Sequence, residues 1–193
     1  MSTYSSDLSA RPQRYSGVAI TLHWVLGLAI VSIFSLGIYM ADLPFSPKSI
    51  KFYNWHKWAG ISILVLSVLR LGWRLTHQPP ELPAAVVRAM PPWQVKAQHT
   101  THALLYALFF AVPLLGWAYS SAAGFPIVWL GQIALPDLLP ADKALAELIK
   151  PLHKLSALAL MGLVALHVAA ALKHHWIDRD GLLLRMLPGR PQA

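Results

Sequence analysis

The sequence of 193 residues contains no cysteine and few charged side chains. Aspartate and glutamate together number 8, and charged residues of both signs make up only 12% of the chain. Without cysteine the chain cannot form disulfide bonds, iron–sulfur clusters or the covalent links of a Cys-x-x-Cys-His motif. Any redox chemistry would therefore need a cofactor that other side chains hold.

Hydrophobic residues make up 56% of the chain, a composition well outside the range of ordinary soluble domains. Four apolar stretches approach the ~20 residues that a helix needs to cross the hydrocarbon of a bilayer. We expect helical spans at approximately 18–41, 56–75, 99–121 and 151–175. Because these spans use up most of the chain, the sequence predicts a single domain over residues 1–193, an all-α integral membrane four-helix bundle.

The net charge of +8 comes from basic residues that flank the apolar stretches. They form no stripe on a soluble face, so we expect a lipid bilayer and no nucleic acid as partner. Ten of the sixteen lysines and arginines, including every arginine, fall on the side of the two termini. The positive-inside rule then places both termini in the cytoplasm. The other side receives only lysines, namely Lys48, Lys51, Lys57, Lys143, Lys150 and Lys154.

Prolines mark several expected boundaries. Pro44 and Pro47 are expected to end the first span, and Pro151 to open the fourth, because proline suits the first turn of a helix. Pro113 lies inside the third span and is expected to kink it. The segment 122–150 is too short and too broken by proline to span, so we expect a cap at the outer surface.

Four of the nine histidines lie in or at the ends of the spans, namely His23, His56, His153 and His167. Ionisable groups are costly in hydrocarbon, so such residues indicate function. Fourteen residues separate His153 from His167, which places them within about 40° of one helix face and about 21 Å apart. This spacing suits two stacked cofactors and is too long for one metal ion.

Each of these two histidines has a partner at matching depth. His56 begins the second span near the depth of His153, and His23 lies in the first span near that of His167. Each pair could give two axial nitrogens to a planar haem inside the apolar bundle. A packed or interfacial side chain is the commoner explanation of a lone membrane histidine, but the matched depths favour two b-type haems.

Other residues at these sites have open interpretations. Gly27 and Gly60 each lie four residues after a candidate ligand and on its face, where they could admit a ring, but close helix packing explains them equally well. His99 and His102, one turn apart at the inner start of the third span, could face the inner haem or a proton path. Spacing alone leaves a pairing of His102 with His167 possible.

Several short runs of the sequence form a recognisable pattern, and these are Tyr15-Ser16, Leu22-His23-Trp24, His56-Lys57-Trp58-Ala59-Gly60, Leu166-His167-Val168-Ala169-Ala170-Ala171-Leu172-Lys173-His174-His175 and Leu182–Pro188. In this pattern nearly the whole chain resembles the bacterial cytochrome b561 family. It implies a di-haem four-helix bundle of the bacterial inner membrane, with His23, His56, His153 and His167 as axial ligands. It also implies superoxide oxidation at the periplasmic face, coupled to reduction of ubiquinone.

The outer lysines are compatible with such a substrate. Together they could produce a positive field that attracts a small anion such as superoxide, although each lysine alone could equally be a solvated loop charge. Lys57 and Lys154 directly follow the two candidate ligands of the outer haem, so we assign them a catalytic role at its edge. No quinone site can be identified from the sequence.

Two other functions remain as alternatives. The chain could be a haem-bearing electron-transfer subunit that docks a soluble redox enzyme, although nothing in the sequence specifies a protein partner. It could also be a transporter that uses histidines without haem, but the near absence of acidic residues in the spans argues against a proton relay. Copurification of a large partner would favour the first, and a colourless protein the second.

Overall fold

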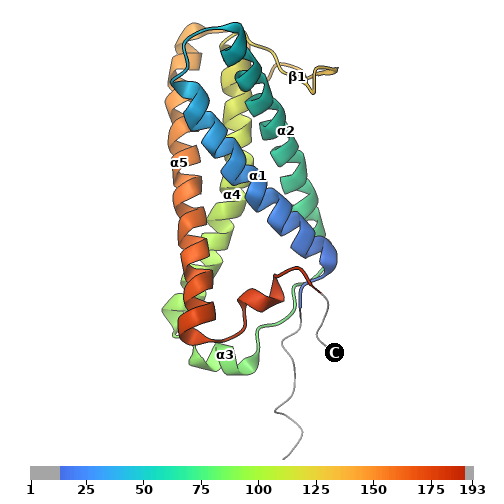
Figure 1. Ribbon diagram of the computed structural model, residues 1–193, viewed down its shortest axis with the longest axis vertical. Coiled ribbons are helices and arrows are strands. Elements are labelled where there is room, and N and C mark those ends of the chain that lie inside the picture. Colours follow the sequence, from blue (N-terminus) through green and yellow to red (C-terminus); the bar gives the residue numbers. More distant parts are fainter. Residues whose placement is uncertain (1–13, 190–193) are drawn as a thin grey trace, which may run out of the picture.

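The structure, a computed structural model, describes residues 14–189 and consists mainly of four long antiparallel helices (Figure 1). A short helix, α3 (Ala84–Ala89), lies in the connection between the second and third of them. In Figure 1 the first long helix runs diagonally across the front of the other three. The four long helices are α1 (Gly17–Ala41), α2 (Pro47–Thr76), α4 (Pro92–Ala122) and α5 (Lys143–Lys173).

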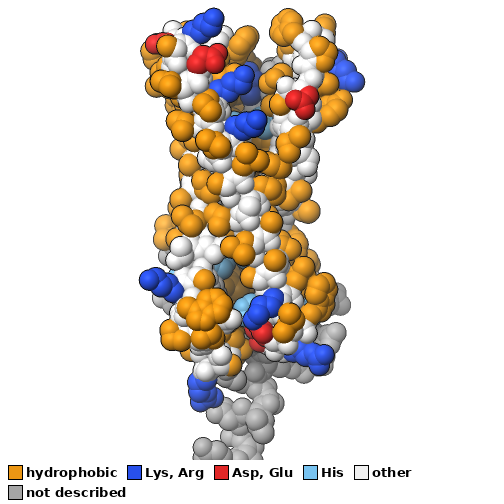
Figure 2. Space-filling model, turned by 90° about the vertical axis from the view of Figure 1, so that its left-hand side faces the viewer, with side chains coloured by type: hydrophobic (Ala, Val, Ile, Leu, Met, Phe, Trp, Pro, Cys, Tyr) orange, Lys and Arg blue, Asp and Glu red, His pale blue; other side chains and the backbone are white. Residues whose placement is uncertain are grey.

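All four long helices are apolar and long enough to cross a bilayer. Their outward faces carry exposed aliphatic side chains, such as Leu28 at 65% and Leu166 at 57% exposure. Such faces suit lipid, because every backbone group of a helix is already hydrogen-bonded within it. Figure 2 shows charged side chains gathered at the two ends of the molecule, with hydrophobic side chains between them. The expected all-α membrane bundle is thus confirmed.

Three long helices begin earlier than the sequence suggested, and one of them, α4, starts at Pro92 instead of near residue 99. α2 starts at Pro47, where Ser46 and Ser49 form a capping box. α5 starts at Lys143, because the Asp142 side chain accepts a hydrogen bond from the backbone at the first turn. Pro47 therefore opens α2, whereas Pro151, expected to open the fourth span, lies inside α5. The two upstream caps extend these helices beyond their apolar cores.

The helices pack in the order α1 on α2, α2 on α4 and α4 on α5. α1 touches α5 only briefly, and α2 and α5 are not closely packed in the part of the chain that the structure describes. The central core is a cluster of five buried aliphatic side chains from all four helices, and these are Leu26, Ile30, Ile63, Leu105 and Leu160. The candidate histidines lie at the two ends of the bundle, and this cluster lies between them.

A small hairpin covers the outer end of α2. Its strands, β1 (Val128–Trp129) and β2 (Ile133–Ala134), pair antiparallel, and it projects from the bundle in Figure 1. The Trp58 indole donates a 2.6 Å hydrogen bond to the Val128 carbonyl, and the Trp129 indole donates to the Trp58 carbonyl at 3.2 Å. The segment expected to be an irregular cap is therefore fixed to α2 by two reciprocal tryptophans.

The inner end is closed by the segment that follows α5. It contains a π-helical turn, η1 (His174–Asp178), and a 3-10 turn, η2 (Leu183–Arg185). The buried Arg185 guanidinium donates to the carbonyls of Pro80 and Glu81, both at 2.8 Å. The Tyr15 backbone N–H donates to the Arg185 carbonyl. These bonds join the start of α1, the α2–α4 connection and the C-terminal segment.

Candidate functional site

The outer candidate pair brings together side chains from α2 and α5. The ring centroids of His56 and His153 are 6.2 Å apart, with the two planes at 88°. The His153 Nδ1–H donates to the Val112 carbonyl at 3.0 Å, which leaves Nε2 as the nitrogen with a free lone pair. The His56 Nδ1 is buried and faces the backbone of Ile33 in α1, although it makes no hydrogen bond of good geometry. A backbone contact at Nδ1 leaves Nε2 as the nitrogen that could bind a metal.

Two glycines make room for these rings. A Cβ atom added at Gly37 would lie 3.1 Å from Cε1 of His56, and one at Gly116 would lie 3.0 Å from Cε1 of His153. Both distances are shorter than ordinary carbon–carbon contact. Neither position could be found from the sequence, because each glycine faces a histidine on another helix and no spacing along the chain reveals that. The sequence showed only that each glycine lies at about the same depth in the membrane as a candidate histidine of another span.

The inner group contains three histidine rings from three helices. His23 and His167 have ring centroids 6.0 Å apart, and His102 lies 5.3 Å from His167. The His102 Nδ1–H donates to the Gln98 carbonyl at 2.8 Å within its own helix. His102 thus joins the predicted inner pair. Figure 2 shows histidine side chains in a hollow near this lower end of the molecule.

The spacing of the rings tests whether a haem iron fits between them. A metal–imidazole bond is about 2 Å long and the ring centre lies about 1 Å behind the nitrogen, so two axial histidines have centroids about 6 Å apart. The two predicted pairs match this distance at 6.2 and 6.0 Å. His102 is closer to His167 than that. Each pair also joins helices that hardly pack on each other, α2 with α5 and α1 with α5.

The two lysines assigned to the outer edge differ in their surroundings. Lys57 is half-buried, and its ammonium lies 3.3 Å from the carbonyl oxygens of both Phe125 and Pro126. Lys154 is exposed on α5 and makes no hydrogen bond or ion pair within residues 14–189. Lys57 therefore helps to hold the loop that follows α4, whereas Lys154 is available to an anion.

The glycines chosen from the sequence have open surroundings. A Cβ atom at Gly27 would meet nothing within 4 Å, and one at Gly60 would lie 3.8 Å from Ile33. His99 borders an inner cavity of about 300 Å³, apart from the three-ring group. A larger outer cavity of about 480 Å³ lies between the ends of α4 and α5, and polar residues on its wall are Tyr119, Asp142, Lys143 and Glu147.

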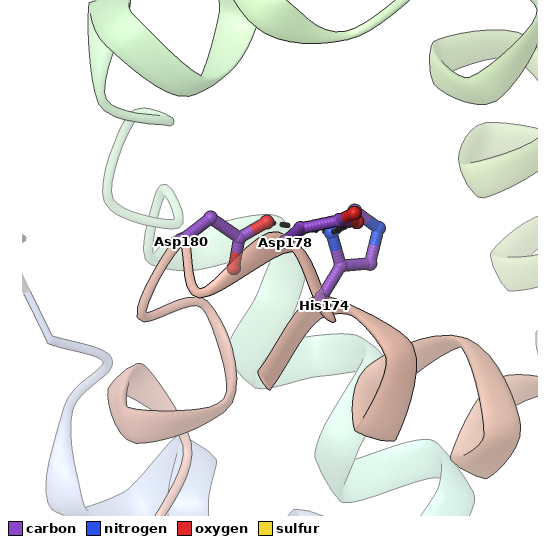
Figure 3. Close-up of side chains that lie close together, drawn as sticks. All are labelled: His174, Asp178 and Asp180. Atoms are coloured by element: carbon purple, nitrogen blue, oxygen red, sulfur yellow. Dashed lines mark hydrogen bonds and ion pairs between the residues drawn. The ribbon is translucent and has the colours of Figure 1, made fainter. Parts of the chain in front are cut away.

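A separate charged cluster follows α5 and is drawn in Figure 3. The His174 Nδ1 lies 2.5 Å from an Asp180 oxygen and 3.1 Å from an Asp178 oxygen, and Lys173 pairs with Asp178 at 2.7 Å. Three such ligand types in one place could hold a metal ion. Here two basic side chains already pair with both carboxylates, so the cluster is explained as an ion-pair network that closes the π-helical turn.

Comparison with known proteins gives consistent matches over nearly the whole chain. A family model described as "Prokaryotic cytochrome b561" matches residues 14–189. The chain is 33% identical to "Cytochrome b561 homolog 2" and 35% identical to "Cytochrome b561 homolog 1", both of Escherichia coli, covering 91% and 92% of this chain and 92% and 98% of theirs. It is 32% identical to "Probable superoxide oxidase CybB" of Yersinia pestis, covering 91% of this chain and 97% of that protein.

Proposed function

Because the chain belongs to the prokaryotic cytochrome b561 family and is thus a bacterial membrane electron-transfer protein, we propose that it carries electrons from superoxide to ubiquinone through two b-type haems. In this proposal His56 and His153 bind one haem, and His23 and His167 bind the other. The inner end, with both termini, faces the cytoplasm of the cell, and the outer end faces the periplasm. The family itself implies b-type haem.

One observation carries the proposal. Two pairs of histidine rings, at opposite ends of the bundle, have centroid separations of 6.2 and 6.0 Å, as two axial ligands of one iron require. The backbone contacts that hold the rings of His56 and His153, and the close approach of Gly37 and Gly116 to these rings, support a dedicated ligand site. Packed or interfacial histidines would not account for both separations.

The choice of superoxide rests on charge and on one relative. A protein 32% identical to this chain is named a probable superoxide oxidase. At the outer end Lys154 is exposed one residue after His153, and Figure 2 shows further basic side chains around a notch at the upper end of the molecule. Such a field attracts a small anion and raises its rate of encounter.

The proposed reaction balances over two turnovers. A bound b-type haem supplies a one-electron carrier that cycles between ferric and ferrous iron. Two superoxide anions lose one electron each and leave as dioxygen, and one ubiquinone gains two electrons and two protons to form ubiquinol. The chain contributes the outer lysines that attract the anion, the histidines that fix the cofactors and the apolar core that excludes water between them.

The first test is a reduced-minus-oxidised spectrum with haem quantification on the purified protein. We expect two haems per chain in the parent, and one in each of the variants His153→Ala and His167→Ala, because each loses one axial ligand. His175→Ala is the matched control, since this histidine lies beside Trp176 outside both pairs. A colourless parent supplied with haem precursor, or loss of haem in the control alone, would overturn the proposal.

A second test separates the enzyme from a docking subunit. The purified chain in liposomes with ubiquinone receives a superoxide pulse, with superoxide dismutase added as a control. Formation of ubiquinol that the dismutase suppresses supports the proposed reaction. Two bound haems without such activity, together with copurification of a large soluble enzyme, would instead identify the chain as a membrane electron-transfer subunit.

A further inference from the structure

One charged side chain inside the bundle has no charged partner. Arg70 lies in α2, in the inner half of the span, and is partly buried. Its guanidinium carbon is 5.9 Å from the centre of the Tyr106 ring, and its Nη2 is 3.1 Å from Nδ1 of His23. Its Nε is buried without a hydrogen-bond partner, and no carboxylate pairs with it among residues 14–189. An unpaired arginine in a membrane span indicates function.

The contact between Arg70 and His23 has a fixed direction. A guanidinium carries only donors, so the His23 Nδ1 must accept this hydrogen bond and be unprotonated. A neutral histidine that binds a metal through Nε2 instead carries its proton on Nδ1 and donates it to an acceptor. His23 therefore cannot accept from Arg70 while it binds iron through Nε2. When His23 ligates through that atom, Arg70 must turn to another acceptor.

Among residues 14–189 no carboxylate is available for this role. Asp178 and Asp180 are already paired with Lys173 and His174, and Glu81 lies in the connection beyond α2. Arginine prefers a carboxylate, which it can bind with two parallel hydrogen bonds. A b-type haem brings two propionate carboxylates with it, and each needs a positive partner if it lies within the apolar bundle.

We infer that Arg70 binds a propionate of the inner haem, releasing His23 to serve as its ligand and setting the reduction potential of that haem. This inference rests on the inner haem of the proposed function. The Arg70 charge lies close enough to interact electrostatically with all three inner rings, His23, His102 and His167. A positive charge there opposes the more positive ferric iron and thus favours the reduced state.

The test is a redox titration of both haems in Arg70→Gln, Arg70→Lys and the control Arg88→Gln, an exposed arginine of α3 at the same end of the molecule. In Arg70→Gln we expect the reduction equilibrium of the inner haem to shift about tenfold toward the oxidised form, about 59 mV for one electron. The outer haem should keep its potential. Arg70→Lys should retain most of the parent value, because the charge remains. Arg88→Gln should match the parent at both haems.

The decisive experiment replaces the cofactor's carboxylates. The parent and the Arg70 variants are reconstituted with haem dimethyl ester, in which both propionates are esterified. We expect Arg70→Gln to bind ordinary haem more weakly at the inner site than the parent does, and to bind the ester as the parent does, because the carboxylate that Arg70 binds is absent from the ester. An equal loss of inner-site affinity for ordinary haem and for the ester would show that Arg70 does not bind a propionate and would overturn the inference.

The other possible results of these two experiments also decide for or against the inference. If Arg70→Gln binds no inner haem, the comparison passes to Arg70→Lys, which should still bind two haems and differ from the parent in inner-haem affinity less with the ester than with ordinary haem. Equal inner potentials in the parent, Arg70→Gln and Arg88→Gln would overturn the inference while leaving two haems, and thus the proposed function, intact. A parent that binds no haem would instead refute the proposed function.

Discussion

Gly116 gives the sharpest test of the outer site. Alanine at this position would place its Cβ 3.0 Å from Cε1 and 3.3 Å from Nδ1 of His153, against about 3.4 Å at the short end of ordinary contact. The ring must therefore move by about 0.4 Å, against its 3.0 Å hydrogen bond to the Val112 carbonyl. Overpacking of this kind typically costs about 1–3 kcal/mol.

We expect Gly116→Ala to weaken binding of the outer haem by about 5- to 150-fold, the equivalent of that free energy. The assay is haem content per chain together with the reduced-minus-oxidised spectrum, measured after titration with limiting haem. The inner haem should bind as in the parent, because His23 and His167 lie at the other end of the bundle. The expected product is thus a protein with one tightly and one weakly bound haem.

Gly162→Ala is the matched control on α5. A Cβ atom added there meets nothing within 4 Å. Alanine is favoured over glycine in a helix by about 1 kcal/mol, so this variant should bind both haems normally and unfold at an equal or higher temperature. If Gly116→Ala binds haem as tightly as Gly162→Ala, then the ring of His153 does not depend on the missing side chain, and our account of the outer site is wrong.

Three further predictions concern other parts of the molecule. Lys154→Gln should slow superoxide-dependent haem reduction several-fold at low salt and little at high salt, because salt screens the attraction between the lysine charge and the anion. In stopped-flow measurements, an effect independent of ionic strength would contradict this. Trp129→Phe removes the indole donor to Trp58 and Ser62 and should lower the free energy of unfolding by about 0.5–1.5 kcal/mol. An unchanged melting temperature in thermal unfolding would show that these hydrogen bonds contribute nothing to stability. His102→Ala should retain two haems by pyridine haemochrome assay, since its ring is closer to His167 than ligation requires; loss of one haem would make it the ligand.

The apolar content of the chain and the positions of its histidines allowed most of the fold to be predicted. The four apolar runs predicted four spans, and the structure has four helices in those places. The depths of the histidines predicted which rings meet, and the structure brings His56 to His153 and His23 to His167. Helix geometry is regular, so position along the chain converts directly into depth in the membrane. His102 also lies beside His167, and the role of these histidines as haem ligands stays a prediction.

Helix ends and the outer connection were harder to predict. Pro151 was expected to begin a helix, yet α5 begins eight residues earlier, where Asp142 caps it. The hairpin that contains Trp129 gave no signal in the sequence, because its strands have two residues each and their position depends on the contact with Trp58. Short elements take their shape from the surface on which they pack.

The sequence by itself therefore determined the membrane architecture, the helical class and the depths of the four candidate ligands, because these depend on composition and on a constant rise per residue. Only the tertiary structure decided which side chains surround each pair. The approach of Gly116 to His153, the unpaired guanidinium of Arg70 beside His23, and the two carbonyls that hold Lys57 all join helices or loops distant in sequence. Rotation of one helix against another sets those contacts, and no periodicity along a single chain encodes it.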